Sequence, residues 1–200
     1  MATVTIGIDI GQKRDPTAVV VAEVGEERPP KTVYTVRFLE RLPLGLPYPK
    51  MVDRITEIVQ RLHSKDPKAE VRLYVDCTGV GGPVVDLLRQ GVTDPLVAVT
   101  LAAGGRLTVH GQEARLGKAF LVARLQVLLQ NGQIWLPKTG EAEALAQELL
   151  DFEIKVDQDG TDRYGAFKVG SHDDLVIALG LATLYDPAAM RVQYAPALYN

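Results

Sequence analysis

The chain opens with apolar residues at a period of two. From Val4 to Gly11 every second residue is valine or isoleucine, which predicts a β-strand with Asp9 on the face opposite the aliphatic row. Two further runs rich in β-branched residues, Thr17 to Val24 and Thr32 to Leu39, lie on either side of the turn-rich segment Gly25 to Lys31. The opening is therefore predicted to form three consecutive antiparallel strands.

Strands and helices then alternate along the chain. The first half should contain a helix from Pro49 to Leu62, a strand from Val71 to Asp76, a glycine-rich turn, a helix from Val84 to Arg89 and a strand from Pro95 to Leu101. The second half should contain a helix from Glu113 to Gln130, a short strand from Ile134 to Leu136 and a helix from Glu141 to Leu150. A hairpin should then join Phe152 to Val156 with Tyr164 to Val169. A last helix is expected from Ser171, and its positions from Leu175 to Leu184 are apolar on almost every face, which is typical of a buried helix. This order predicts one α/β domain over residues 1–186, with a tail at 187–200. The domain should hold a mixed sheet with helices on both faces and an added β-hairpin.

Composition narrows the class of protein. Of 200 residues, 46% are hydrophobic, which is enough to bury one sizeable core. No apolar run is long enough to cross a bilayer and no secretory leader pattern occurs, so a soluble intracellular protein is expected. The single cysteine, Cys77, excludes an internal disulfide and a thiolate zinc cage. A net charge of -3 argues against wholesale electrostatic capture of nucleic acid, so any contact with DNA should be local.

Four aspartates occupy positions that the pattern predicts to be buried. Asp9 and Asp76 end strands, and Asp173 and Asp174 open the buried helix. Carboxylates in apolar surroundings are costly unless something such as a divalent cation compensates their charge. Oxygen donors without histidine or thiolate favour Mg²⁺ or Mn²⁺, and two such ions roughly 4 Å apart support phosphodiester hydrolysis. In this hypothesis Asp9 bridges two ions, Asp76 and Asp174 each hold one, and Asp173 orients water or completes a ligand shell.

Each aspartate also has an ordinary structural interpretation. Ser171 and Asp174 have the spacing of a capping box, Asp9 stands where a turn residue would, and Asp76 before Thr78 is typical of an Asx-turn. Each interpretation suffices for one residue alone. Their coincidence at three predicted element ends favours a shared site, although the division of roles between Asp173 and Asp174 stays open.

Three segments carry a resemblance to a known family. They are Gly7-Ile8-Asp9-Ile10-Gly11 with Asp15, Pro16 and Thr17, then Val75-Asp76-Cys77-Thr78-Gly79-Val80-Gly81-Gly82, and finally Ser171-His172-Asp173-Asp174-Leu175. Together they resemble the nuclease domains of phage large terminases over most of the chain. The resemblance implies a ribonuclease H-like fold and an endonuclease that cuts concatemeric double-stranded DNA during packaging in the cytoplasm of the infected bacterial host. It also implies the terminase ATPase domain, the small terminase subunit and the portal as partners, and a catalytic metal site at Asp9, Asp76, Asp173 and Asp174.

Basic residues near the predicted strand ends and in the hairpin are the candidate DNA contacts. They are Lys13, Arg14, Arg106, His110, Arg115, Lys118, Arg163, Lys168 and His172. The more common role of such residues is that of solvated surface charges. With so few cations, binding should be tolerant of sequence and sensitive to salt. No G-x-x-x-x-G-K-[ST] motif occurs, so the chain looks like a nuclease domain excised from, or made apart from, a packaging ATPase.

Three other interpretations remain open. A RuvC-like junction resolvase also places an aspartate in its first strand and an acidic residue at the start of an apolar last helix. An actin-like or sugar-kinase-like nucleotide-binding domain resembles the segment Gly7 to Gly11 with Thr17, but such proteins need two domains to enclose a nucleotide. A non-catalytic module that docks onto the packaging motor is the third.

Overall fold

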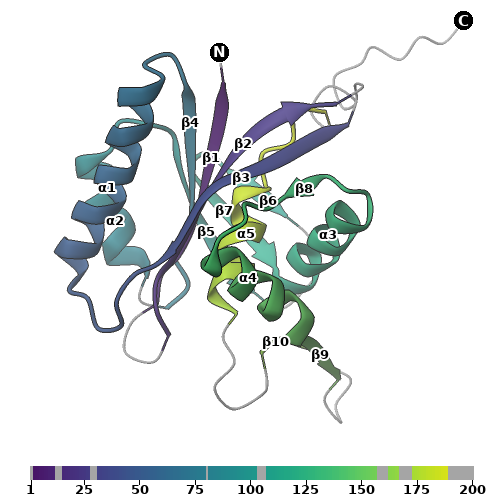
Figure 1. The fold of residues 1–200 in the computed structure, drawn as a ribbon. Coiled ribbons are helices and arrows are strands. Elements are labelled where there is room, and N and C mark those ends of the chain that lie inside the picture. The colour runs from purple at the N-terminus through teal and green to yellow at the C-terminus, as the bar shows by residue number, and fades with distance from the viewer. Residues whose placement is uncertain are drawn as a thin grey trace, which may run out of the picture.

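A mixed eight-stranded sheet runs through the middle of the molecule and separates two layers of helices (Figure 1). The computed structural model describes residues 2–11, 15–27, 31–79, 81–102, 107–156, 162–166 and 173–188. The strands are β1 (Thr3–Asp9), β2 (Ala18–Glu26), β3 (Thr32–Arg41), β4 (Glu70–Asp76), β5 (Leu96–Ala102), β6 (Thr108–His110), β7 (Glu113–Gly117), β8 (Ile134–Trp135), β9 (Phe152–Val156) and β10 (Asp162–Ala166). The helices are α1 (Tyr48–Lys65), α2 (Gly81–Gly91), α3 (Lys118–Gln130), α4 (Gly140–Asp151) and α5 (Asp174–Ala182).

The strand order confirms the predicted mixed topology. It runs β6-β7-β5-β4-β1-β2-β3-β8, and β9 pairs with β10 in a separate hairpin. The meander β1-β2-β3 is antiparallel, whereas β4 lies parallel to β1 and β5 lies parallel to β4. The first and fourth strands, which are distant in sequence, are therefore neighbours at the centre of the sheet.

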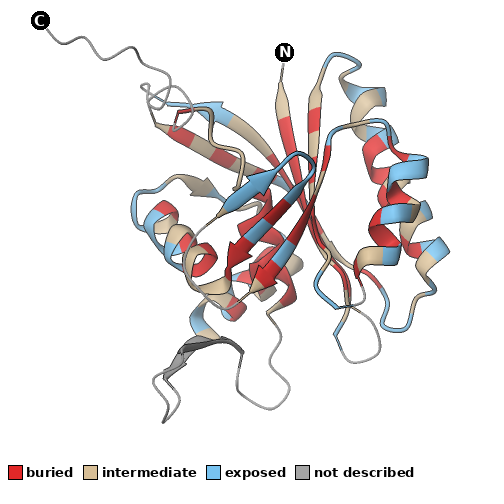
Figure 2. Cartoon of the chain, turned by 180° about the vertical axis from the view of Figure 1, so that it is seen from behind, coloured by how far each residue is buried: buried red, intermediate tan, exposed pale blue. Residues whose placement is uncertain are grey.

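Two hydrophobic cores lie on opposite faces of the sheet. Helices α1 and α2 cover one face, and α3, α4 and α5 cover the other. Figure 2 shows the buried segments of the helices turned toward the sheet. The alternation in β1 decides which residue meets which core, because Ile6 and Ile8 pack beneath α1 while Thr5 and Gly7 face α5. The side chain of Asp9 lies on the α5 side by the same alternation.

Close contact between β1 and α5 depends on a residue without a side chain. A Cβ atom placed on Gly7 would lie 1.9 Å from the carbonyl oxygen of Ala178 and 2.4 Å from the backbone nitrogen of Ala182. Glycine at this position therefore lets helix and strand approach backbone to backbone. This contact sets how far the first turn of α5 lies from the end of β1.

One predicted helix was partly wrong. The segment Glu113 to Gly117 forms strand β7, and α3 begins only at Lys118. The first four residues alternate exposed and buried, with Ala114 and Leu116 buried, and the strand pairs in parallel with β5. The helical spacing of the following residues extends back over this segment, which hid the period of two. Strand β6 was not predicted at all.

The last helix differs in its limits from the prediction. Its described part begins at Asp174, with Asp173 as N-cap, and it ends at Ala182 rather than at Leu184. The predicted start at Ser171 lies outside the described residues. Every residue of the helix is buried, as its apolar pattern predicted.

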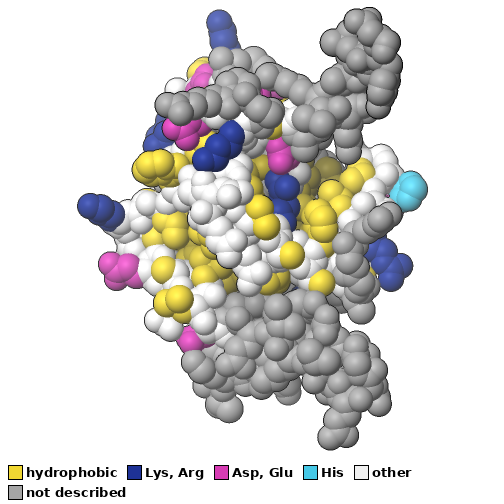
Figure 3. All heavy atoms as spheres, turned by 90° about the vertical axis from the view of Figure 1, so that its right-hand side faces the viewer, with side chains coloured by type: hydrophobic (Ala, Val, Ile, Leu, Met, Phe, Trp, Pro, Cys, Tyr) yellow, Lys and Arg dark blue, Asp and Glu magenta, His cyan; other side chains and the backbone are white. Residues whose placement is uncertain are grey.

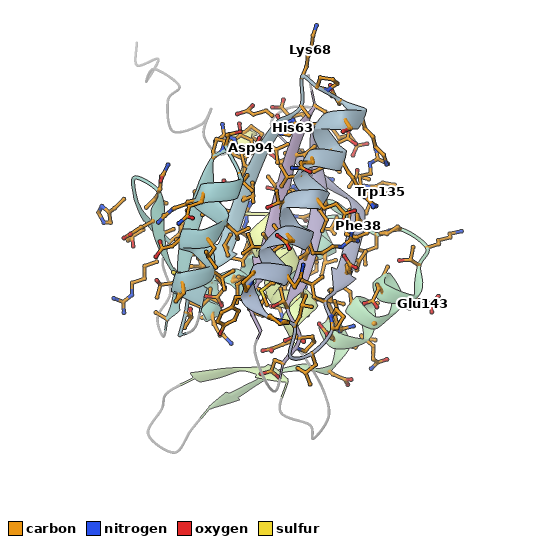
Figure 4. The ribbon with its side chains drawn as sticks, turned by 90° about the vertical axis from the view of Figure 1, so that its left-hand side faces the viewer. Phe38, His63, Lys68, Asp94, Trp135 and Glu143 are labelled. Carbon is orange, nitrogen blue, oxygen red and sulfur yellow. The ribbon has the colours of Figure 1, made fainter. Side chains whose placement is uncertain are left out.

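Polar contacts fasten the periphery to the sheet. The Nη2 of Arg124 on α3 donates to the carbonyl oxygen of Thr183 at 2.8 Å and to the hydroxyl of Tyr34 at 3.0 Å. On the other face, His63 at the end of α1 lies beside Asp94, with 2.9 Å from Nε2 to Oδ1 (Figure 4). None of the helices in the described part of the chain is both long and apolar enough to cross a membrane.

Candidate metal centre at the ends of β1 and β4

The parallel pairing of β1 and β4 places two aspartates side by side. Ile8 is the register partner of Val75, so the next residues along the two strands, Asp9 and Asp76, leave the sheet at the same edge. Backbones of paired strands lie about 4.8 Å apart. Both side chains point toward the α5 face, since the residues before them, Ile8 and Val75, pack in the core beneath α1.

Helix α5 supplies the other two aspartates. Its backbone contact with Gly7 aims its first turn at the end of β1. Asp174, the first helical residue, is 3% exposed, and Asp173, the N-cap, has a side chain that is 28% exposed. The side chain of Lys118, at the start of α3, reaches the same place, and its Nζ lies 3.9 Å from Oδ2 of Asp173.

The charges of these groups act on one another. Burial raises the pKa of Asp9 well above its usual value, and the charges of Asp76, Asp174 and Asp173 raise that pKa further, while Lys118 opposes the rise. The pKa of Asp76 is also raised, chiefly by burial, and the hydrogen bonds from Thr78 counteract this. Asp9 is thus close enough to the other three predicted aspartates for their charges to raise its pKa.

Asp174 has the clearest shift. Burial raises the pKa of Asp174 to about 7, helped by the charges of Glu148, Asp15 and Asp173, while Arg41 opposes the rise. Like charges held together at a poorly solvated site disfavour the ionised state of each carboxylate. A bound cation would remove that penalty, so the site is electrostatically suited to one.

The turn after β4 is built tightly around Asp76. The amide of Thr78 donates to Oδ1 of Asp76 at 2.8 Å, which confirms the Asx-turn interpretation, and the hydroxyl of Thr78 accepts from the amide of Leu101 at 2.8 Å. A Cβ atom on Gly81 would lie 2.2 Å from the carbonyl oxygen of Asp76. The turn and the strand end are therefore held together, and one oxygen of the Asp76 carboxylate accepts a backbone hydrogen bond.

The donor set fits Mg²⁺ or Mn²⁺ in chemistry. All four predicted ligands are carboxylates, the hard oxygen donors that these ions prefer. Among the residues that the structure describes, no group of three His, Cys, Asp or Glu side chains is already arranged as a metal-binding cluster. The carboxylates are gathered in one place without forming a finished ligand cage.

Glu148 and Arg41, which lie behind the carboxylates, escaped the sequence analysis. Glu148 on α4 is 6% exposed, and its Oε2 accepts from the amides of Leu175 and Val176, while its Oε1 pairs with Arg41 at the end of β3. A signal was present, because Ala142, Leu145 and Glu148 follow one another at a helical spacing of three on the buried face of α4. A charged residue on such a stripe indicates a buried polar contact.

The predicted DNA contacts are only partly described. Arg115 is exposed on β7, His110 is exposed on β6, and Lys118 lies beside the carboxylates. Arg163 lies on β10, of which the structure describes the backbone, and Lys13, Arg14, Arg106, Lys168 and His172 lie outside the described residues. On the face shown in Figure 3, the described basic side chains stand singly between hydrophobic and acidic ones. No continuous basic surface is visible there among the described residues, in keeping with the net charge of -3.

Comparison with solved structures defines the class of fold. Neither a search against protein families nor one against curated proteins finds a match for this sequence. Solved structures do match, and they show that the chain has the ribonuclease H-like fold of large terminase nuclease domains, as predicted.

Three of these structures illustrate the likeness. The large terminase nuclease of the thermophilic phage G20c with bound magnesium is 21% identical, with 90% of this chain and 80% of that chain covered at a TM-score of 0.57. The nuclease domain of Thermus phage P74-26 is 19% identical, with coverage of 90% and 78% and a TM-score of 0.57. The manganese-soaked, inhibitor-bound terminase nuclease domain of human cytomegalovirus is 17% identical, with coverage of 94% and 86% and a TM-score of 0.61.

Proposed function

We propose that this chain is a divalent-metal-dependent endonuclease of the large terminase type, which hydrolyses phosphodiester bonds of double-stranded DNA while concatemeric phage DNA is packaged. The observation that carries the proposal is the position of Asp9, whose pKa is raised by burial and by the charges of three further aspartates. Such a group of carboxylates at the end of parallel strands suits the binding of cations. The likeness to terminase nuclease structures, among them one with bound magnesium and one with bound cobalt, supports the choice of chemistry.

Each aspartate has a proposed place. Asp9, whose pKa responds to the charges of the other three, would contact two ions. Asp76 and Asp174 would each hold one, and Asp173 would complete a ligand shell or orient water. Two Mg²⁺ or Mn²⁺ ions, when bound, supply Lewis acidity that activates water and stabilises the leaving oxygen. The contact of Oδ1 of Asp76 with Thr78 fixes one carboxylate, and the burial of Asp174 excludes water from another. Both effects hold ligands in place before the ions arrive.

Basic residues near the carboxylates would hold the DNA backbone. Lys118 lies within reach of Asp173, and Arg115 is exposed on β7, three residues earlier. In this proposal both contact phosphates, together with Lys13, Arg14, Arg106, Arg163, Lys168 and His172. Arg115→Ala should weaken duplex binding at low salt and lower its salt dependence by about one phosphate contact. An unchanged salt dependence in a fluorescence anisotropy titration would remove Arg115 from the interface.

The surroundings of the enzyme follow from the same proposal. It would act in the cytoplasm of an infected bacterium, together with a terminase ATPase domain, a small terminase subunit and a portal. The domain would span residues 1–186, with residues 187–200 as a tail. These 200 residues contain no P-loop, so the ATPase domain would lie outside them.

Plasmid cleavage tests the proposal. Purified chain is incubated with supercoiled plasmid and Mg²⁺, Mn²⁺, Ca²⁺ or chelator, beside Asp9→Asn, Asp76→Asn and Asp174→Asn. Asp86→Asn is the matched control, because Asp86 has a 75% exposed side chain that pairs with Arg89 on α2 and is none of the proposed ligands. Cutting with Mg²⁺ or Mn²⁺ that the three site variants lose and the control keeps is the expected result.

Two outcomes would contradict the proposal. Absence of cutting with every metal, at high protein and low salt, would favour a docking module or a nucleotide-binding domain. Preferential cutting of a four-way junction over linear duplex would favour a RuvC-like resolvase. Both substrates belong in the same experiment, because the metal chemistry of the two enzymes is alike.

A further inference from the structure

We propose that Glu148 is a positioning residue that caps helix α5 in place of the helix's own N-cap residue, Asp173, and so keeps the carboxylate of Asp173 available to the metal centre. This inference rests on the proposed function. It assigns a task to a buried acid that lies behind the proposed ligands and does not itself need to bind the ions.

The hydrogen bonds show the capping directly. Oε2 of Glu148 accepts from the amide of Leu175 at 3.1 Å and from the amide of Val176 at 3.2 Å. These are the second and third residues of α5, the amides that an N-cap side chain ordinarily satisfies. Asp173 occupies the N-cap position, and within the described chain its side chain makes no capping hydrogen bond. The cap therefore comes from α4.

Glu148 is held in that position from its other side. Its Oε1 pairs with Nη2 of Arg41, and Nη1 of Arg41 lies 3.2 Å from Oε2 of Glu141. With 6% exposure, Glu148 would be a costly charge without such partners. One carboxylate thus joins the end of β3, the last turns of α4 and the first turn of α5.

The cap from Glu148 determines where the carboxylate of Asp173 points. Aspartate is among the preferred N-cap residues, so without Glu148 the nearest acceptor for these two buried amides would be the carboxylate of Asp173 itself. That carboxylate would then turn toward the helix end. In the structure it lies instead toward Lys118, at 3.9 Å, on the side of the carboxylate group. Because Glu148 caps the helix, Asp173 does not have to serve both as the capping side chain and as the metal ligand that the sequence predicts.

Manganese binding by the full chain, measured by isothermal titration calorimetry, tests this directly. Glu148→Ala should weaken Mn²⁺ binding by roughly 10- to 100-fold, the usual effect of losing a group that orients a ligand. Glu148→Gln keeps an oxygen that can accept from both amides, and it should stay within about threefold of wild type. Leu145→Val, a cavity variant of the same buried face of α4, lowers stability without touching the cap and should bind Mn²⁺ as wild type does.

A double-mutant cycle shows whether Glu148 acts through Asp173. On an Asp173→Asn background, Glu148→Ala should cause little further loss of Mn²⁺ affinity. Equal losses on both backgrounds would overturn the proposal, as would a Glu148→Gln variant that binds as poorly as Glu148→Ala, since charge alone would then explain the effect. If Glu148→Ala fails to fold, Glu148→Met keeps the side-chain volume and takes its place in the cycle.

The two proposals fail in different ways. If wild-type protein binds no Mn²⁺ at all, the metal centre itself is wrong and this inference falls with it. If wild type binds Mn²⁺ and Glu148→Ala binds it equally well, the metal centre stands and only the capping role is overturned.

Discussion

Replacing Gly7 with alanine should separate α5 from the sheet. The added Cβ would lie 1.9 Å from the carbonyl oxygen of Ala178, and since such contacts stay above 3.0 Å, the two backbones must part by about 1.1 Å. Neither partner is a flexible side-chain end, so the strain cannot be relieved by a rotamer change. Overpacking of this kind costs at least about 1 to 3 kcal/mol of stability. The same shift displaces Asp174, and a misplacement of about 1 Å at a catalytic site costs roughly 100-fold in rate.

Gly25→Ala is the matched control for Gly7→Ala. Gly25 also lies in a strand, but a Cβ there would meet nothing within 4 Å. Urea denaturation gives the change in the free energy of unfolding, and plasmid cleavage by the folded fraction gives the change in rate. If Gly7→Ala unfolds at the same urea concentration as Gly25→Ala and cuts equally fast, the argument that glycine sets the distance between helix and strand is refuted.

Two further predictions concern charge. Because the pKa of Asp174 is raised to about 7, mainly by burial and then by Glu148, the metal-free folded state keeps a proton that the unfolded chain releases near pH 4. The free energy of unfolding should therefore fall between about pH 4 and pH 7, with up to about 4 kcal/mol of the fall coming from Asp174. Asp174→Asn should make the fall shallower without removing it, because the pKa values of Asp9 and Asp76 are raised as well, and equal pH slopes in both proteins would contradict this. Arg124→Ala removes the donor to three partly buried acceptors, the hydroxyl of Tyr34, the carbonyl oxygen of Thr183 and Oδ2 of Asp186. It should lower the free energy of unfolding by about 2 to 4 kcal/mol in urea denaturation. Arg61→Ala, which removes an exposed pair with Glu57, should cost under about 1 kcal/mol, and equal losses would refute the ranking.

The residues of the candidate site were predictable because each stands at the end of an element with a clear period. Alternating aliphatic residues defined β1 and β4, and strand ends at one edge of a sheet are where ligands bind. The sequence could not show that Ile8 is the register partner of Val75, which makes Asp9 and Asp76 neighbours. That pairing comes from the crossover through α1, a tertiary feature.

The parts that could not be predicted depend on contacts between distant segments. Gly7 looked like an ordinary strand residue, and only the approach of Ala178 shows why a side chain is excluded there. The DNA contact of Lys118 stays a prediction, but its place 3.9 Å from Oδ2 of Asp173 could not be foreseen, because strand β7 precedes α3. Glu148 is a charged residue on the buried face of α4, which could be seen in the sequence. The amides that it caps could not be foreseen, because they belong to another helix, α5.

The two outermost strands of the sheet are very short. At one border β6 has three residues, and at the other β8 has two. A long border strand would offer a row of unused amides and carbonyls on which an identical molecule could add its own strand, which is a common route to aggregation. On the β8 side, however, the short strand covers only Tyr34 and Thr35 of β3, so among the described strands none pairs with the outer side of β3 from Val36 to Arg41, and that stretch is where a strand of a second molecule could add.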